Sequence, residues 1–271
     1  FFRNKVILIT GATGFLGKPL VAKILTDLSD VQKMYLLIRI RTEPNGKVYS
    51  AEERLENEFF TSSVFAKLRA SHGEQFDSWI HEKVYAVEGN LADEQLGMSP
   101  ACYERLQREV QVFINAAALV KFDAPIDEAV QLNTFSAKHA VEFAKGCHDA
   151  VLIHVSTAYV CGNRTGKVAE ELRPPYETYA AQHREETGEA IPDTLEAEIE
   201  EMLRLSEAVR IEAEQPQQRH QFRHEALRQL GNGKRNNAEL LNKQIDIVRD
   251  KWIEARLVDV GMKRAEARGW N

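Results

Sequence analysis

The pattern of apolar and polar positions divides the chain into two parts. In roughly the first 171 residues, short runs of aliphatic residues alternate with longer amphipathic stretches. Nearly continuous apolar runs are typical of buried parallel strands, and amphipathic stretches at a period of 3.6 are typical of the helices that join them. The strands are expected at residues 5–10, 33–39, 83–88, 110–114 and 151–155.

The same alternation predicts the fold class. Helices are expected over about 15–28, 50–70, 100–108 and 126–146, and the first of them would bury a stripe at Leu16, Leu20, Ile24 and Leu28. Residues 40–49 are expected to form a polar loop. Strands that alternate with helices favour an α/β protein with a doubly wound, parallel, Rossmann-type sheet and right-handed crossovers. Numbered along the chain, the expected strand order is 3-2-1-4-5.

From about residue 172 the chain becomes rich in Glu, Gln, Arg and Ala. Apolar stripes predict three helices, which makes residues 172–271 a C-terminal helical insert beside a dinucleotide-binding domain at 1–171. The stripes are Leu195, Ile199, Met202 and Val209 before a break at Pro216, a second stretch over 219–230, and Leu241, Ile245, Val248 and Trp252. The insert could be a solvated hairpin, a lid, a dimer contact or a peripheral membrane contact.

A glycine-rich turn follows the first expected strand. Gly11, Gly14 and Gly17 stand in the spacing G-x-x-G-x-x-G at the start of a helical pattern. A helix N-terminus presents unpaired N–H groups, and residues without a Cβ let a pyrophosphate approach. This segment therefore predicts a dinucleotide site, the alternative being a turn without a ligand. The site residues expected here are Thr10, Gly11, Thr13, Gly14, Phe15, Leu16 and Gly17.

The end of the second strand indicates which dinucleotide binds. An acidic residue usually meets the ribose of NAD about 20 residues after the glycines. Here Arg39 holds that place, with Arg41 nearby. A guanidinium pairs with a 2′-phosphate, so the sequence favours NADPH. The alternative is that Arg39 is a solvated strand end.

The remaining strand ends supply candidates for the rest of the site. Asn90 and Leu91 are expected to hold the adenine, and the small residues after Asn115 would let the backbone pass close to the cofactor; these are Ala116, Ala117 and Ala118. A hydroxyl at Thr157, or at Ser156 as second choice, would donate a hydrogen bond to a substrate carbonyl during hydride transfer. His154 is expected to be a core residue, and Cys161 is a weaker candidate nucleophile.

Bulk composition excludes several classes of function. The formal charge is −6, with 44% hydrophobic and 28% charged residues, so nucleic acid is not an expected partner. The three cysteines have no metal-ligand spacing and predict no metal site. Reduced thiols and the lack of a signal peptide or a long apolar run favour a cytoplasmic protein.

Taken together, these motifs resemble the extended short-chain dehydrogenase/reductase superfamily, and within it the alcohol-forming fatty acyl-CoA reductases, which include plant male-sterility type proteins. Thioester-reductase domains of carboxylic acid reductases and peptide synthetases share much of the pattern. The resemblance covers about residues 5–171. It rests on residues 10–18, 36–39, 89–91 with 96–97, 115–118 with 121–123, 132–134 and 154–160.

The resemblance implies an oxidoreductase that uses NADPH to reduce a fatty acyl-CoA to an aldehyde and then to an alcohol. It adds Asn133 to the cofactor-binding residues and implies a Ser/Thr, Tyr, Lys catalytic set, in which Thr157 matches the Ser/Thr. Two features depart from the family: Asn90 replaces an Asp, and no Tyr precedes a Lys by four residues. We therefore expect a fragment that binds NADPH but lacks its proton donor. The alternatives are a reductase or epimerase of nucleotide sugars or steroids, or a non-catalytic NADP-binding domain.

Overall fold

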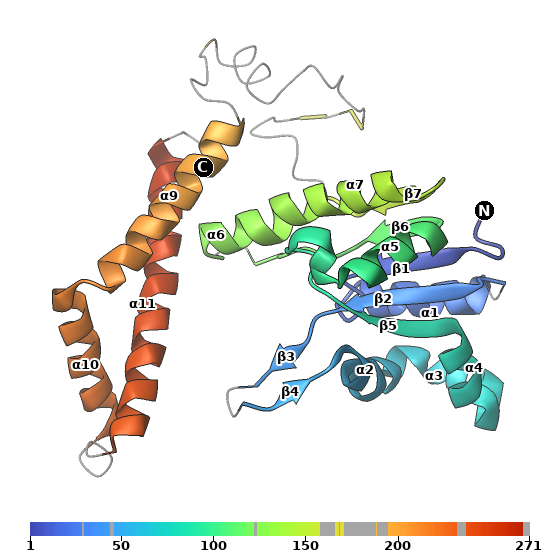
Figure 1. Ribbon diagram of the computed structural model, residues 1–271, viewed down its shortest axis with the longest axis horizontal. Helices are drawn as coiled ribbons and strands as arrows, with labels where there is room; N and C mark the ends of the chain where they lie inside the picture. The colour runs from blue at the N-terminus through green and yellow to red at the C-terminus, as the bar shows by residue number, and fades with distance from the viewer. Residues whose placement is uncertain are drawn as a thin grey trace. The chain divides into compact units, whose positions relative to one another are not determined.

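The computed structural model describes residues 1–28, 30–43, 46–121, 124–157, 166–167, 169–170, 188, 195–231 and 237–267. The chain forms two compact units, one made of residues 1–120 and 131–162 and the other of residues 121–130 and 163–271 (Figure 1). The predicted boundary at residues 171 and 172 lies outside the described residues.

The first unit is built on a five-stranded parallel sheet in the order β5-β2-β1-β6-β7. This is the predicted order 3-2-1-4-5 in the numbering of the expected strands, so the Rossmann-type α/β fold is confirmed. The central strand β1 is buried along its whole length. The strands are β1 (Val6–Thr10), β2 (Lys33–Ile38), β5 (Val84–Glu88), β6 (Val112–Asn115) and β7 (Val151–His154).

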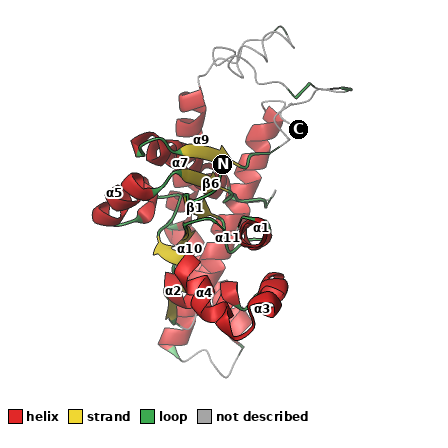
Figure 2. Ribbon diagram, turned by 90° about the vertical axis from the view of Figure 1, so that its right-hand side faces the viewer, coloured by secondary structure: helices red, strands yellow, loops and turns green. Residues whose placement is uncertain are grey.

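Helices cover both faces of this sheet because successive side chains of a strand point to opposite faces. Ile7 and Ile9 of β1 belong to one core cluster, and Leu8 between them belongs to a second. Figure 2 shows β1 and β6 between α1 on one side and α5 and α7 on the other. These helices are α1 (Gly17–Asp27), α5 (Pro100–Glu109) and α7 (Ser136–Gly146).

Helix α1 buries a different stripe from the predicted one. Leu16 is 49% exposed because it is the N-cap residue and lies before the helix proper. The helix instead buries the face that carries Val21, Ile24 and Leu25. Of the predicted stripe, only Ile24 is fully in the core.

The connection from β2 to β5 contains more structure than predicted. Residues expected to form a polar loop include a two-stranded antiparallel ribbon, β3 (Arg41–Thr42) and β4 (Val48–Tyr49), which projects from the sheet in Figure 1. A capping box at Ser50 and Glu53 then starts the predicted helical region. That region continues beyond residue 70 to the start of β5. Its segments are α2 (Ala51–Arg54), η1 (Leu55–Phe60), η2 (Ser63–Phe65), α3 (Ala66–His72), η3 (Gly73–Gln75) and α4 (Phe76–Lys83).

The edge strand β7 is more exposed than expected. Val151, Ile153 and Val155 are each more than a third exposed, and His154 is also exposed. The prediction that His154 is a core residue is therefore wrong. The physical reason is that β7 ends the sheet, and β6 alone pairs with it among the described strands.

The described elements of the second unit are helices, so the predicted C-terminal helices are confirmed, and the unit also takes in residues 121–130, which the prediction placed in the dinucleotide-binding domain. Its elements are α6 (Ile126–Ala129), α9 (Leu195–Ala213), α10 (Pro216–Leu230) and α11 (Ala238–Ala267). Pro216 begins α10 at its first position, where a missing N–H costs nothing. Buried Phe222 packs against Trp252, and Arg264 forms a two-bonded pair with Glu198 at 2.5 and 2.7 Å. None of the described helices is long and apolar enough to cross a membrane.

Candidate functional site

The glycine loop fits tightly between β1 and the end of β6. Gly11 has φ +69°, and a Cβ there would lie 2.5 Å from the carbonyl oxygen of Ala116. A Cβ on Gly17 would lie 2.2 Å from the carbonyl oxygen of Gly11. The Gly14 N–H donates to the Gly11 carbonyl at 3.0 Å and closes the turn. The backbone therefore follows a path that side chains at Gly11 and Gly17 would block.

The loop leads into a helix N-terminus suited to an anion. Helix α1 has no side-chain cap at Leu16 and no acidic residue in its first turn, so its first N–H groups keep their partial positive charge. Thr13 is half-buried beside the exposed Gly14, and Phe15 is fully exposed. This arrangement meets the requirements of a phosphate cradle.

A buried hydrogen-bond network holds the loop from behind. The Thr10 hydroxyl donates to Oδ1 of Asn115 at 2.5 Å, and both side chains are almost fully buried. The Ala117 N–H donates to Thr10 Oγ1 at 3.3 Å and to Asn115 Oδ1 at 3.4 Å. The Asn115 amide nitrogen lies 3.0 Å from Nδ1 of His154. Thr10 and Asn115 thus act on the backbone around the site and leave no polar atom exposed to a ligand.

Arg39 follows β2 directly, and its backbone is fixed by Arg54, which no sequence pattern indicates as a site residue. Arg54 Nη1 donates to the Arg39 carbonyl oxygen at 2.6 Å, while Glu58 accepts from Arg54 at 3.2 Å. Glu58 also pairs with Arg41 at 2.7 Å. Among the described residues no carboxylate pairs with the exposed Arg39 guanidinium. Arg39 is therefore available to a ligand, whereas Arg41 is already engaged.

Asn90 and Leu91 are held within their own loop. The Asn90 amide donates to Asp93 at 3.0 Å, and its Oδ1 accepts weakly from the Ala92 N–H at 3.4 Å. Leu91 is only 6% exposed and packs in the second core cluster. The Asn90 side chain keeps acceptor capacity at the carboxyl end of β5, but Leu91 has little surface for an adenine.

Asn133 acts on the loop that follows Ala118. Its Oδ1 accepts from the Leu119 N–H at 2.8 Å, and its Nδ2 donates to the Leu119 carbonyl oxygen at 3.0 Å. Both polar ends of the side chain are used in this clamp. Asn133 lies in the π-helical segment η5 (Val130–Phe135), whose geometry sequence periodicity does not reveal. Asn133 therefore holds the end of the segment that carries Ala116, Ala117 and Ala118.

Ser156 and Thr157 follow β7 directly and are exposed. The Val155 N–H donates to the Asn115 carbonyl oxygen at 2.9 Å, which extends the pairing of β7 with β6 up to these residues. Tyr159 and Cys161 lie outside the described residues.

Strand register brings these segments to one edge of the sheet. Thr10 pairs with both Leu37 and Asn115, Asn115 pairs with His154, and Leu37 pairs with Val87. The predicted convergence of the five strand ends is therefore present. Uncapped N–H groups, an unpaired guanidinium and hydroxyls lie on this edge, and together they fit a phosphorylated dinucleotide. Among the described residues no cluster of His, Cys, Asp and Glu could hold a metal ion.

Comparisons with known proteins show the family of the chain. The family described as male sterility protein matches residues 9–226. The probable fatty acyl-CoA reductase 5 of Arabidopsis thaliana is 42% identical over 174 residues, which cover 63% of this chain and 34% of the relative. The alcohol-forming fatty acyl-CoA reductase of Simmondsia chinensis is 38% identical over 173 residues, with the same coverage of 63% and 34%.

Among solved structures, the terminal R domain from the myxalamid PKS-NRPS biosynthetic pathway matches with 26% identity and a TM-score of 0.47. The match covers 62% of this chain and 38% of that domain. The chain spans about a third of the length of the curated relatives it matches, and the matched part is its N-terminal 63%.

Proposed function

Because the chain belongs to the male sterility protein family, we propose that it is the NADPH-binding part of a fatty acyl-CoA reductase. The observation that carries the cofactor assignment is that the uncapped N-terminus of α1 and the exposed Arg39, whose guanidinium pairs with no described carboxylate, both follow strands whose carboxyl ends lie on one edge of the sheet. The substrate assignment is supported by the names of the relatives, which are fatty acyl-CoA reductases. A cytoplasmic location stays a prediction from the cysteine content.

In this proposal, different residues bind different parts of the cofactor. The N–H groups that follow Gly14 hold the pyrophosphate, and Arg39 holds the 2′-phosphate through charge-assisted hydrogen bonds. Asn90 would accept a hydrogen bond from the adenine, and the small side chains of the Ala116–Ala118 segment would let its backbone lie close to the cofactor. Thr10, Asn115, Asn133 and Arg54 position these segments through the contacts described above.

When bound, NADPH supplies the hydride. The Thr157 hydroxyl, or that of Ser156, donates a hydrogen bond to the oxygen of the thioester carbonyl and stabilises the negative charge that develops there. Hydride addition to the carbonyl carbon and cleavage of the C–S bond release an aldehyde and the thiol of CoA, with one proton taken up. A second hydride and a second proton convert the aldehyde to the alcohol.

Calorimetric titration of the 271-residue chain with NADPH and with NADH tests the cofactor assignment. We expect NADPH to bind at least about tenfold more tightly, because a guanidinium–phosphate pair is among the strong hydrogen-bonded contacts. Arg39→Gln should weaken NADPH binding by about the same factor and leave NADH binding unchanged. Arg108→Gln, an exposed arginine of α5, is the matched control and should change neither.

Two results would contradict different parts of the proposal. Equal affinities for NADPH and NADH in the unmodified chain would remove the role of Arg39. A lack of binding by either nucleotide would remove the dinucleotide site itself. Because no Tyr in this chain precedes a Lys by four residues, we expect little or no NADPH oxidation with a long-chain acyl-CoA, and measurable turnover would contradict the expectation that the proton donor is missing. Thr157→Val should lower any such turnover without weakening NADPH binding.

A further inference from the structure

The hydrogen bonds that order strand β2 continue one residue beyond its end. The last paired residues of β2 and β5 are Ile38 and Glu88, and the Gly89 N–H donates to the Ile38 carbonyl oxygen at 3.3 Å. The carbonyl oxygen of the next residue, Arg39, accepts from Nη1 of Arg54 at 2.6 Å. The backbone that carries the Arg39 side chain is therefore held by a ladder bond before it and by a side-chain bond at its own carbonyl.

Arg54 is itself anchored by the start of the helical region. It is the last residue of α2, whose first turn is fixed by the capping box of Ser50 and Glu53. The neighbouring helical residues Ala51 and Leu55 are buried in the first core cluster. The Arg54 side chain is only 15% exposed, so packing restricts the positions that its guanidinium can take.

Glu58, four residues further along the chain, fixes the orientation of the Arg54 guanidinium. Its Oε2 accepts from both Nε and Nη2 of Arg54 at 3.2 Å, and this leaves Nη1 to reach Arg39. The other carboxylate oxygen, Oε1, pairs with Arg41 at 2.7 Å, and the Arg41 guanidinium also lies 4.8 Å from the ring centre of Tyr49. Glu58 therefore engages both neighbouring arginines and leaves Arg39 as the guanidinium of this group that pairs with no described carboxylate.

The pair of Arg54 and Glu58 supplies order rather than charge. Its two charges cancel, so it adds little attraction for an incoming anion. An exposed arginine has many rotamers, and holding it in one of them costs free energy on binding. A backbone that is fixed beforehand lowers this cost, because the guanidinium must meet phosphate oxygens in a defined planar geometry.

We propose that Arg54 and Glu58 are positioning residues that set the preference for NADPH over NADH, because they hold the backbone of Arg39 so that its guanidinium meets the 2′-phosphate. The inference rests on the proposed function, since it takes Arg39 as the phosphate ligand. NADH has no phosphate at that position, so loss of the pair should not change its affinity. A purely structural role would instead weaken the binding of both nucleotides alike.

Calorimetric titration of the full 271-residue chain with NADPH and with NADH tests the pair. The double variant Arg54→Met with Glu58→Gln, here the pair variant, keeps the net charge and removes the bond to the Arg39 carbonyl. We expect it to weaken NADPH binding about fivefold, because Arg39 is less ordered before binding, and to leave NADH binding unchanged. Arg54→Lys keeps the charge but lacks the planar fork that joins Glu58 to Arg39, and should give a smaller loss in the same direction.

A double-mutant cycle separates positioning from direct contact. Since Arg54 acts through Arg39 in this account, the pair variant should cause no further loss of NADPH affinity in a chain that already carries Arg39→Gln. Losses that add together would make Arg54 a phosphate ligand in its own right and would overturn the positioning role.

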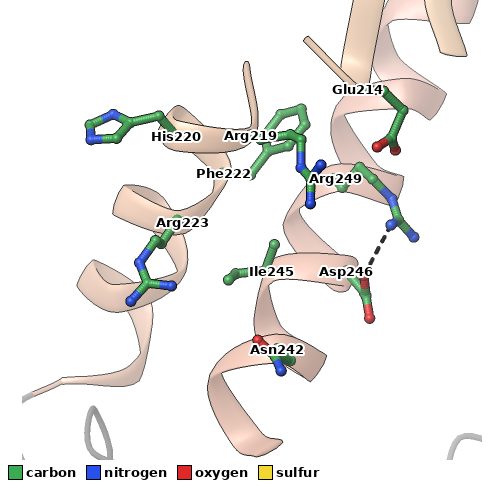
Figure 3. A pocket seen from close by; sticks show the side chains of 9 residues that line it. All are labelled: Glu214, Arg219, His220, Phe222, Arg223, Asn242, Ile245, Asp246 and Arg249. Atoms are coloured by element: carbon green, nitrogen blue, oxygen red, sulfur yellow. Dashed lines mark ion pairs between the residues drawn. The ribbon is translucent and has the colours of Figure 1, made fainter. Parts of the chain in front are cut away.

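The matched control is an arginine–carboxylate pair of the helical unit. Arg249 pairs with Asp246 at 3.0 Å, both residues line a cavity of about 410 Å³, and Figure 3 draws the pair with a dashed line. Arg249→Met with Asp246→Asn also keeps the net charge. This control should leave both affinities unchanged, because the pair belongs to the helical unit and not to the unit that carries Arg39.

The outcomes distinguish this inference from the proposed function. Equal affinities of the unmodified chain for NADPH and NADH, or no effect of Arg39→Gln, would remove the phosphate role of Arg39 and the inference with it. A loss with Arg39→Gln but none with the pair variant would overturn the inference alone, as would equal weakening of both nucleotides by the pair variant. Circular dichroism checks that each variant is folded, and if the pair variant is not, the affinities of Arg54→Lys decide by the same criteria.

Discussion

Gly11 occupies a backbone conformation and a space that exclude a side chain. Its φ is +69°, and a Cβ would lie 2.5 Å from the Ala116 carbonyl oxygen. We expect Gly11→Ala to lower the free energy of unfolding by about 2–4 kcal/mol, because left-handed strain and a backbone clash add together. Urea unfolding followed by circular dichroism measures this loss, and nucleotide titration should show weaker binding as the loop shifts.

Gly46 is the matched control for the clash. It also has a positive φ, +84°, but no atom of the described residues beyond its chain neighbours lies within 4 Å of the place its Cβ would take. Gly46→Ala should therefore lose only the conformational part, about 1 kcal/mol. If both variants lost the same free energy of unfolding, the clash of the added Cβ with Ala116 would contribute nothing to that loss.

Cys147 should be a poorly reactive thiol. Burial raises its pKa to about 11, so at about pH 8 it is almost entirely protonated, and alkylation needs the thiolate. We expect iodoacetamide to modify Cys147 at least about 100-fold more slowly in the folded chain than in urea. Peptide mass spectrometry separates its rate from those of Cys102 and Cys161.

The same shift sets a direction for stability against pH. The unfolded chain releases the Cys147 proton at about pH 9, whereas the folded chain holds it up to about pH 11. The contribution of this thiol to folding stability is therefore complete below about pH 9 and is lost as the pH rises to about 11. Equal alkylation rates in the folded and unfolded chains would contradict this account.

At the scale of single residues, the sequence predicted which residues lie at the site better than it predicted the role of each one. Gly11 and Arg39 could be placed because Gly11 begins the glycine-rich turn after the first expected strand and Arg39 ends the second. The clamp of Asn133 on Leu119 and the bond from Arg54 to the Arg39 carbonyl could not. Both join side chains to backbone groups of other segments, about 14 and 15 residues away, and no local pattern encodes such contacts.

Among the elements, α9 and α11 are joined by a shielded ion pair. Arg264 and Glu198 have side chains that are 17% and 11% exposed, and two hydrogen bonds join them. Arg264→Met should lower the free energy of unfolding of the helical unit by about 3 kcal/mol, because Glu198 would keep a poorly solvated charge without this partner. Thermal unfolding followed at 222 nm measures the loss.

The control for this pair lies on the same helix. Lys263 pairs with Asp259 at 3.0 Å, but its side chain is 66% exposed, and such pairs contribute little. Lys263→Met should change the stability by less than about 0.5 kcal/mol. A loss as large as that of Arg264→Met would show that removal of any positive charge from α11 is enough.

The elements that could be predicted are those with a strong local pattern. The five aliphatic runs gave the sheet and its order, because buried parallel strands need continuous apolar residues and right-handed crossovers limit the topology. The ribbon of β3 and β4 escaped prediction because two-residue strands show no periodicity. Helix α4 escaped because only Phe76 and Ile80 of its residues are buried.

For the molecule as a whole, the matches to known proteins cover the two units to different extents. The match to curated relatives covers the N-terminal 63% of the chain, and the family match ends at residue 226. The glycine loop and the strand ends lie within both. Helix α11, which begins at Ala238, lies beyond both.

The exposed strand β7 has a consequence for the colloidal behaviour of the chain in solution. Its outer edge, beside Val151 and Ile153, pairs with none of the described strands, and such an edge is a template for another strand. Light scattering should show particle size rising with protein concentration, and Ile153→Lys should suppress the rise. If size were independent of concentration in the unmodified chain, the edge would be protected. If the size does rise with concentration, this strand, rather than the melting temperature, sets the shelf life of a concentrated sample.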